Sequence, residues 1–385
     1  MAKPVVQQAV NWDVYDAQAQ AAIRSNGVEM FQQISSQTVT PSSQNVLNIT
    51  PQNVGLIRGF MVVVSGTLAN TGGSQATRTQ FGAANALSNI QFNDLQNNVR
   101  INTTGAHLAM LASAKNGFGF GGAYAPNLPY NIGNNNTVQT LASTIAATNG
   151  TAALQQIYYI PLAYSADDLR GAIYAGVVQA TMNLQLTINA TPGYTTGDPV
   201  AAIAGGASTA VAWSGGVTVT VYQVYIDQLP LAQDGSVILP PRALSHIYDL
   251  KSTTISGLTA GQDFSIQYPN LRSFLSTFLL YDNAGTFNTG SDVNYFALQS
   301  ANFTNIFKYP PSIAALNARQ AIMADFPNAL YYFDTRKKPI STIQYGNMSL
   351  VINPAAVTTG ATVQMWYEAF AITNNISSAG SLPTS

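Results

Sequence analysis

The chain repeats a set of short apolar segments, in the same order, in its two halves. The matched pairs are 57–60 with 271–274, 157–160 with 330–333, 186–189 with 350–353, and 218–219 with 362–363. The separation within a pair shortens steadily along the chain, so the second copy follows the same plan with shorter connections. Chance matches would not keep this order. The sequence therefore predicts a duplicated β domain. Such a duplication favours a structural role in an assembly over a catalytic function.

The length of 385 residues agrees with two domains, because one hydrophobic core usually stops growing at about 250–300 residues. An apolar content of 46% is enough to build such cores. The predicted division is an N-terminal helical arm at 1–40, a first domain at 41–230, a connecting segment at 231–247, a second domain at 248–372 and a C-terminal tail at 373–385.

Charged residues are scarce. They make up 8% of the chain, against about 25% in ordinary globular proteins. Because surface charge normally keeps a monomer soluble and resists association, this scarcity indicates a surface covered by neighbours; a secreted β protein with amide-rich loops is the alternative. The net charge of −1 and the single basic run at 336–338 argue against direct nucleic-acid binding, which needs many cations. The chain has no cysteine, which excludes disulfides.

The first part of the chain is expected to be a helical arm. Residues 11–34 are rich in alanine, Asn11 is a suitable N-cap, and Gly27 is expected to break the helix. No segment in the second half matches this stretch, so the arm is an addition to the repeat.

From residue 38 onward the pattern predicts β strands. Valine alternates with polar residues over 217–221, as in a strand with one buried face. Two short helices, with Thr104 and Ser312 as caps, are expected before the two matched Tyr-Tyr segments. A third short helix is expected from the Pro-Pro pair at 240–241 through His246.

Motifs for chemistry are weak. The G-x-G-x-x-G pattern at 117–122 follows a predicted helix instead of a strand, so it is interpreted as a loop and not as a dinucleotide site. His107 and His246 have no partner at zinc-ligand spacing, and His107 is expected to be a packing residue. The carboxylates at 167–168 are adjacent, unlike the flanking pair of a glycosidase, and Ser165 indicates a capping-box variant. We predict no enzyme activity, cofactor or metal site.

An ordered set of short stretches also covers both halves. They are TPQNVG at 50–55, PLAYS at 161–165 with DL at 168–169, DQLP at 227–230, NL at 270–271, LST at 275–277, DFP at 325–327 and QYGN at 344–347. The set resembles the major capsid protein of tectiviruses, the tailless icosahedral bacteriophages with an internal membrane.

This resemblance implies an all-β chain of two tandem eight-stranded jelly rolls with short helices and an N-terminal helical arm. It implies a structural major capsid protein of the virion, assembled in the cytoplasm of a bacterial host. The expected unit is a homotrimer that forms a pseudo-hexagonal capsomer of an icosahedral shell. Expected partners are neighbouring trimers, vertex and minor capsid proteins, and an internal membrane, without direct nucleic-acid contact.

The resemblance also implies that the arm lies on the inner side of the shell. The residues expected to contact the membrane or neighbouring capsomers are Trp12, Tyr15, Ile23, Arg24 and Phe31.

Two alternatives remain open from the sequence. A jelly-roll carbohydrate-binding or host-attachment spike protein would use loop aromatics to stack on sugars, and the candidates are Tyr124, Tyr130, Tyr194 and Trp213. An enzyme on the same fold, such as a jelly-roll hydrolase or cupin, is disfavoured by the shortage of His and Glu.

Overall fold

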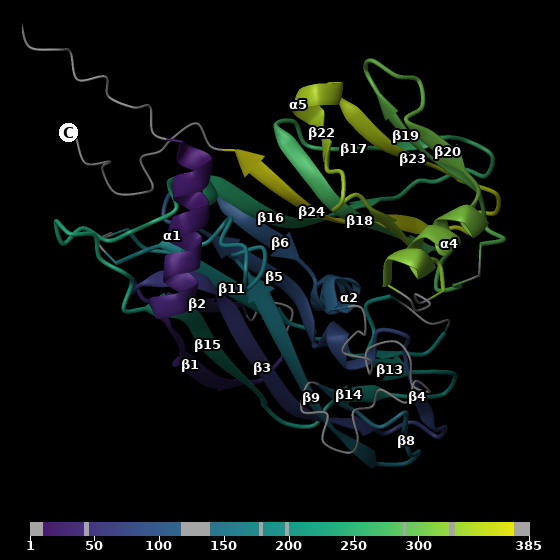
Figure 1. The fold of residues 1–385 in the computed structure, drawn as a ribbon. Helices are drawn as coiled ribbons and strands as arrows, with labels where there is room; N and C mark the ends of the chain where they lie inside the picture. Colours follow the sequence, from purple (N-terminus) through teal and green to yellow (C-terminus); the bar gives the residue numbers. More distant parts are fainter. Residues whose placement is uncertain are drawn as a thin grey trace, which may run out of the picture.

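The computed structural model describes residues 11–41, 46–116, 139–176, 180–196, 200–287, 290–322 and 328–372. It consists mainly of β strands in two successive barrels (Figure 1). The strands of the first barrel lie between Val28 and Asp227, and those of the second between His246 and Ile372. The second barrel, green to yellow, lies beside the first along one edge (Figure 1).

Two facing walls form the first barrel. One wall has the strand order β1-β15-β3-β9 and the other has the order β2-β11-β5-β6. Their bounds are β1 (Val28–Val39), β15 (Val217–Asp227), β3 (Leu56–Asn70), β9 (Gly150–Pro161), β2 (Val46–Ile49), β11 (Asn183–Ile188), β5 (Leu87–Asn93) and β6 (Val99–Thr103). Alternate residues point inward, and Phe60 on β3 meets Phe92 on β5 with ring centroids 5.4 Å apart. The apolar core therefore lies between the walls.

The second barrel repeats this arrangement strand for strand. Its walls have the orders β16-β24-β18-β21 and β17-β23-β19-β20. The bounds are β16 (His246–Ile255), β24 (Thr362–Ile372), β18 (Arg272–Asp282), β21 (Leu330–Asp334), β17 (Phe264–Gln267), β23 (Met348–Pro354), β19 (Val293–Ser300) and β20 (Phe307–Tyr309). Both barrels are thus eight-stranded jelly rolls, which confirms the predicted fold class and the duplication.

Shorter strands extend these walls or form small sheets. They are β4 (Ala76–Arg78), β7 (Gln139–Thr140), β8 (Thr144–Ile145), β10 (Ile173–Tyr174), β12 (Gly193–Tyr194), β13 (Ala204–Gly205), β14 (Val211–Trp213) and β22 (Ile340–Ser341).

The repeated Asn at the end of the 186–189 and 350–353 segments has a structural reason. Asn189 and Asn353 are both buried. The amide of Asn189 donates to the carbonyl of Ala201 at 2.7 Å, and that of Asn353 to the carbonyl of Gly261 at 3.3 Å. Because a buried polar side chain needs such partners, each Asn holds a loop against its barrel at the matched position.

The barrels are joined through an edge contact. Strand β6 of the first barrel pairs in parallel with β16 of the second, with Ile101 opposite Leu250 and Asn102 opposite Lys251. One nine-stranded sheet therefore runs from the first barrel into the second.

Some helices have a counterpart at the same position in the other barrel, and others have none. They are α1 (Trp12–Asn26), the 3-10 helix η1 (Gly82–Ala86), α2 (Gly105–Asn116), α3 (Pro241–Leu244), α4 (Pro311–Ile322) and α5 (Thr342–Tyr345). Helices α2 and α4 precede β9 and β21, as predicted. The Thr104 hydroxyl accepts from the amide of His107 at 3.3 Å, which confirms the cap of α2. At α4 the carbonyl of Pro310 accepts the amide of Ile313, and Ser312 lies inside the helix, so the cap predicted at Ser312 is wrong.

Two predicted helix ends are corrected. The side chain of Asn11 caps α1 by accepting hydrogen bonds from the amides of Asp13 and Val14. The helix ends at Asn26, at the break predicted at Gly27, and does not continue to residue 34. Val28–Val39 pairs instead with β15 along its whole length, so the first barrel begins at Val28 and the arm boundary at 40 is wrong. Similarly, α3 ends at Leu244 and β16 begins at His246, before the boundary predicted at 248.

Candidate functional site

Among the residues that the structure describes, no three His, Asp or Glu side chains are grouped to hold a metal. His107 is fully buried, with Nδ1 2.6 Å from the hydroxyl of Thr103 and its ring stacked on Trp366 at 5.6 Å. Burial, and then the nearby charge of Lys115, lowers the pKa of His107 to about 3. His107 is therefore a neutral packing residue, as predicted.

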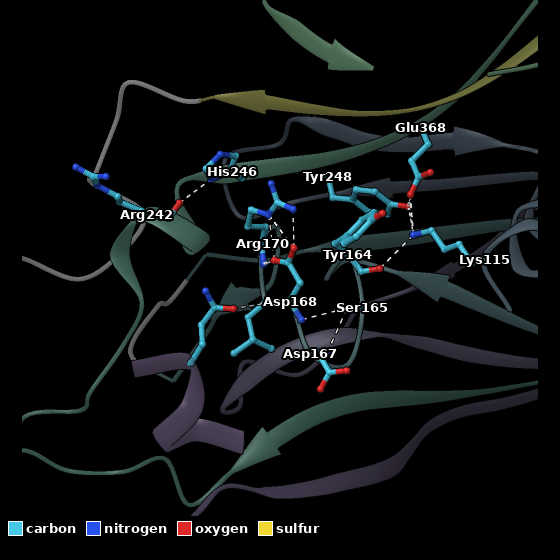
Figure 2. A network of polar contacts seen from close by, with 12 residues as sticks. Lys115, Tyr164, Ser165, Asp167, Asp168, Arg170, Arg242, His246, Tyr248 and Glu368 are labelled. Carbon is cyan, nitrogen blue, oxygen red and sulfur yellow. Dashed lines mark hydrogen bonds and ion pairs between the residues drawn. The ribbon is translucent and has the colours of Figure 1, made fainter. Parts of the chain in front are cut away.

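The adjacent aspartates lie in a turn (Figure 2). The Ser165 hydroxyl accepts from the amides of Asp167 and Asp168 at 3.2 and 3.1 Å. It caps a turn and not a helix, so the capping-box interpretation is wrong in that respect. Both carboxylate oxygens of Asp168 accept hydrogen bonds from the guanidinium of Arg170, and this pairing gives Asp168 a structural role. The motif at 117–122 lies outside the described residues.

The most concentrated polar contacts join the two barrels. Glu368 on β24 is fully buried and accepts hydrogen bonds from the hydroxyl of Tyr248 on β16 and from the ammonium of Lys115 at 2.6 Å (Figure 2). It also accepts a hydrogen bond from the hydroxyl of Ser276 on β18 at 2.9 Å. Lys115 belongs to α2 of the first barrel. An ion pair thus ties the first barrel to the outer face of a wall of the second.

Every group in this cluster has partners. The ammonium of Lys115 also donates to the carbonyl of Tyr164 at 3.1 Å and to the hydroxyl of Tyr248 at 2.7 Å, and it lies 4.3 Å above the ring of Tyr164. Burial, and then the charge of Glu368, raises the pKa of Tyr248 well above its usual value, so the hydroxyl stays protonated and donates. A buried ion pair adds little net stability but is costly to break; this cluster therefore fixes how the barrels are joined.

Two arginines extend the junction. Arg336 is held by both oxygens of Asp334 and donates to the carbonyl of Ala114, at the C-terminal end of α2, at 3.1 Å. Arg170 lies 4.4 Å from the ring centroid of Phe370 on β24. Arg336, the first residue of the basic run at 336–338, therefore has a structural role, and the two lysines that follow it are exposed.

Helix α1 packs against the first barrel where β3 begins and β15 ends. Ile23 is completely buried among Leu56, Leu169 and Ile226. The carboxylate of Asp16 accepts from the backbone amides of Arg242 and Ala243 and thereby caps α3, which the sequence did not predict. The helix is consequently part of the folded body.

The five predicted contact residues of the arm separate into different environments. Trp12 and Tyr15 are exposed on α1, with their rings edge to face at 5.9 Å. Phe31 is exposed but lies on β1, and Arg24 pairs with Asp167. Ile23 is buried inside the chain, so its prediction as a membrane or capsomer contact is wrong.

Two of the four aromatic residues of the carbohydrate alternative, Trp213 and Tyr194, are described by the structure, and neither is fully exposed. Trp213 on β14 donates its indole N–H to the carbonyl of Asn189 at 2.7 Å and packs against the first core. Tyr194 is half-buried on the short strand β12. Tyr124 and Tyr130 lie outside the described residues. The arrangement gives the carbohydrate alternative no support.

Solved structures similar to this chain include viral capsid proteins. The crystal structure of the STIV major capsid protein matches with a TM-score of 0.63 and 12% identity, covering 92% of this chain and 100% of that chain. PBCV-1 VP54, fitted into a reconstruction of the virophage Sputnik, matches with a TM-score of 0.52 and 11% identity, covering 90% and 94%. Such identities show the fold alone, and that fold is the double jelly roll of major capsid proteins.

Sequence similarity narrows this class to one family. The family described as P3 major capsid protein N-terminal matches residues 4–229, and P3 major capsid protein C-terminal matches residues 245–384. Major capsid protein P3 of Enterobacteria phage PRD1 is 38% identical over 371 residues, which cover 95% of this chain and 93% of that protein. The chain belongs to the P3 major capsid protein family, whose members are structural components of the virion capsid. The predicted relationship to tectiviruses is confirmed.

Proposed function

We propose that the chain assembles as a homotrimer whose six jelly rolls form one pseudo-hexagonal capsomer of an icosahedral shell. The observation that carries this proposal is the duplication: two barrels of identical strand order are joined rigidly by β6–β16 pairing and by the Lys115–Glu368 cluster. Three chains then supply six similar units around one axis, as closed symmetry requires. The shortage of charged residues, at 8%, supports extensive covered surfaces. The role is structural, without catalysis.

The native mass of the purified protein tests the trimer. Light scattering should detect a species of three chains, each of 40.7 kDa, that persists on dilution. A stable monomer would contradict the proposal.

The outward side of α1 is proposed to face the internal membrane. Trp12 and Tyr15 are exposed there, and Trp and Tyr favour the interface between lipid and water. None of the helices in the described ranges is long and apolar enough to cross a membrane. A shell separated from its genome by lipid also suits a net charge of −1. Neighbouring trimers and vertex and minor capsid proteins complete the proposed partners, with assembly in the bacterial cytoplasm.

The arm is best tested by substitution, because deleting α1 would uncover the core around Ile23. A double variant, Trp12→Ala with Tyr15→Ala, should form normal trimers but fewer membrane-containing particles. Phe303→Ala, which removes an exposed aromatic ring from the second barrel, serves as the matched control. Normal particle yield from the double variant would refute the proposed role of α1.

A further inference from the structure

A buried ion pair lies at the turn between β5 and β6 of the first barrel. Asp94 and Arg100 are 3% and 7% exposed, and Nε of Arg100 donates to Oδ2 of Asp94 at 2.7 Å. The other carboxylate oxygen, Oδ1, accepts hydrogen bonds from the backbone amides of Gln96 and Asn98, each at 2.9 Å. The carboxylate therefore receives three hydrogen bonds and, with about four acceptor positions, can accept one more.

The guanidinium of Arg100 also has unused hydrogen-bonding capacity. An arginine side chain carries five N–H donors in one rigid plane. Besides the bond to Asp94, the guanidinium makes one hydrogen bond to the described part of the chain, in which Nη1 donates to the carbonyl of Gly171 at 2.9 Å. Since donors buried away from water need acceptors, the remaining N–H groups require a further partner beside the ion pair.

A small cavity adjoins this ion pair. Its volume is about 20 Å³, and both Asp94 and Arg100 line it. Leu244 of α3 and Ile247 of β16 line it as well, so the cavity lies where the first barrel meets the segment that leads into the second. One bound water needs roughly 10–15 Å³ of such space. The cavity therefore admits a water molecule and excludes phosphate and larger ligands.

Gly171 fixes the position of the guanidinium beside the cavity. Its φ of 90° lies in the left-handed region that favours glycine, and a Cβ at this position would lie 2.6 Å from Cβ of Tyr248 on β16. Glycine therefore lets the backbone pack against the second barrel while its carbonyl accepts from Arg100. Its amide donates to the carbonyl of Ala243 in α3 at 3.3 Å, and the next three residues, 172–174, line the cavity.

The charges of the lining select a neutral ligand. A carboxylate and a guanidinium in contact neutralise each other, so the cavity offers no net attraction to a cation or an anion. The side chains of Leu244 and Ile247 make no hydrogen bonds, and the unused donor and acceptor positions belong to Arg100 and Asp94. A ligand that both accepts and donates within so small a volume is water. Gln96 at the same cavity is exposed, which gives the water a route from solvent.

We propose that one water molecule occupies this cavity, accepting a hydrogen bond from the guanidinium of Arg100 and donating one to the carboxylate of Asp94. The water completes the polar contacts of two buried charges and fills the space against Leu244 and Ile247. It thereby belongs to the seam at which β6 pairs with β16. The cavity lies within one chain, so the inference is independent of the proposed trimer.

Crystals of the full chain, at a resolution that shows ordered water, test the inference. We expect a peak in the cavity within hydrogen-bond distance of a guanidinium nitrogen of Arg100 and a carboxylate oxygen of Asp94. Parallel crystals are pressurised with xenon, which enters dry apolar cavities, or soaked in bromide, which marks an anion site by its anomalous signal. Absence of density in the cavity, or a xenon or bromide peak there, would overturn the inference.

A double variant tests the assigned hydrogen bonds. Asp94→Asn with Arg100→Met removes both charges and most of the hydrogen-bonding groups around the cavity, so the cavity should lose the water peak and gain a xenon peak. The control, Asp167→Asn with Arg24→Met, removes an exposed ion pair and should keep the water and exclude xenon. A water peak that persists without the buried ion pair would contradict the inference. The wild-type crystals decide the question if the double variant does not fold.

Discussion

The ion pair between the barrels makes a strong prediction for the variant Glu368→Gln. The substitution keeps the shape of the side chain but removes its charge. The ammonium of Lys115, whose side chain is 21% exposed, then lies in the junction without its counter-ion. Tyr248 and Ser276 also lose a charged acceptor for their hydrogen bonds.

The expected magnitude follows from the burial. Removing one partner of a buried ion pair costs about 3–5 kcal/mol, and the partial exposure of Lys115 favours the lower figure, about 3 kcal/mol. An unfolding entropy of about 2.1 cal/mol/K per residue gives roughly 0.8 kcal/mol/K for a cooperative unit of 385 residues. The melting temperature should therefore fall by about 4 °C.

Differential scanning calorimetry at fixed scan rate measures this change. A double variant with Lys115→Met as well should recover part of the loss, because no unpaired charge remains. Asp167→Asn is the matched control: the Arg24–Asp167 pair is solvent-exposed, and its melting temperature should stay nearly unchanged. A melting temperature of Glu368→Gln equal to that of the wild type would refute the reasoning.

Two further predictions concern pH. The folded-state pKa of His107, about 3, lies below its ordinary 6.5, so stability is lost as pH falls from about 6.5 toward 3, by up to about 1.4 kcal/mol per pH unit. His107→Gln should flatten this slope in denaturant titrations, and parallel slopes would contradict the burial argument. Burial raises the pKa of Asp16 above 3.8, so its contribution is largest below pH 3.8 and declines as pH rises through the raised value. As pH rises, the melting temperature of the wild type should fall relative to that of Asp16→Asn. A melting-temperature difference that does not change with pH would contradict the prediction.

The repeated segments predicted the duplicated fold because alternation of buried and exposed residues is a local property of a strand. Val217, Val219 and Val221 face the core as the alternation predicted. The cap of α2 at Thr104 was likewise local, since it depends on the next three residues.

The errors occurred where a distant partner decided the conformation. Residues after Gly27 have a composition compatible with a helix, but pairing with β15, which follows nearly the whole first barrel in the chain, draws them into a strand. Tertiary pairing overrides weak local propensity. Ile23 was predicted as an external contact because helical spacing does not say which surface lies opposite the helix.

The sequence by itself determined two β domains of one plan, short helices at matched positions and a chain poor in charge, because these depend on residue order and composition. Only the tertiary structure decided that Glu368 of one barrel meets Lys115 of the other and that Asp16 caps α3. Such contacts depend on how the two barrels and α1 dock, and docking joins residues whose separation along the chain leaves no local pattern.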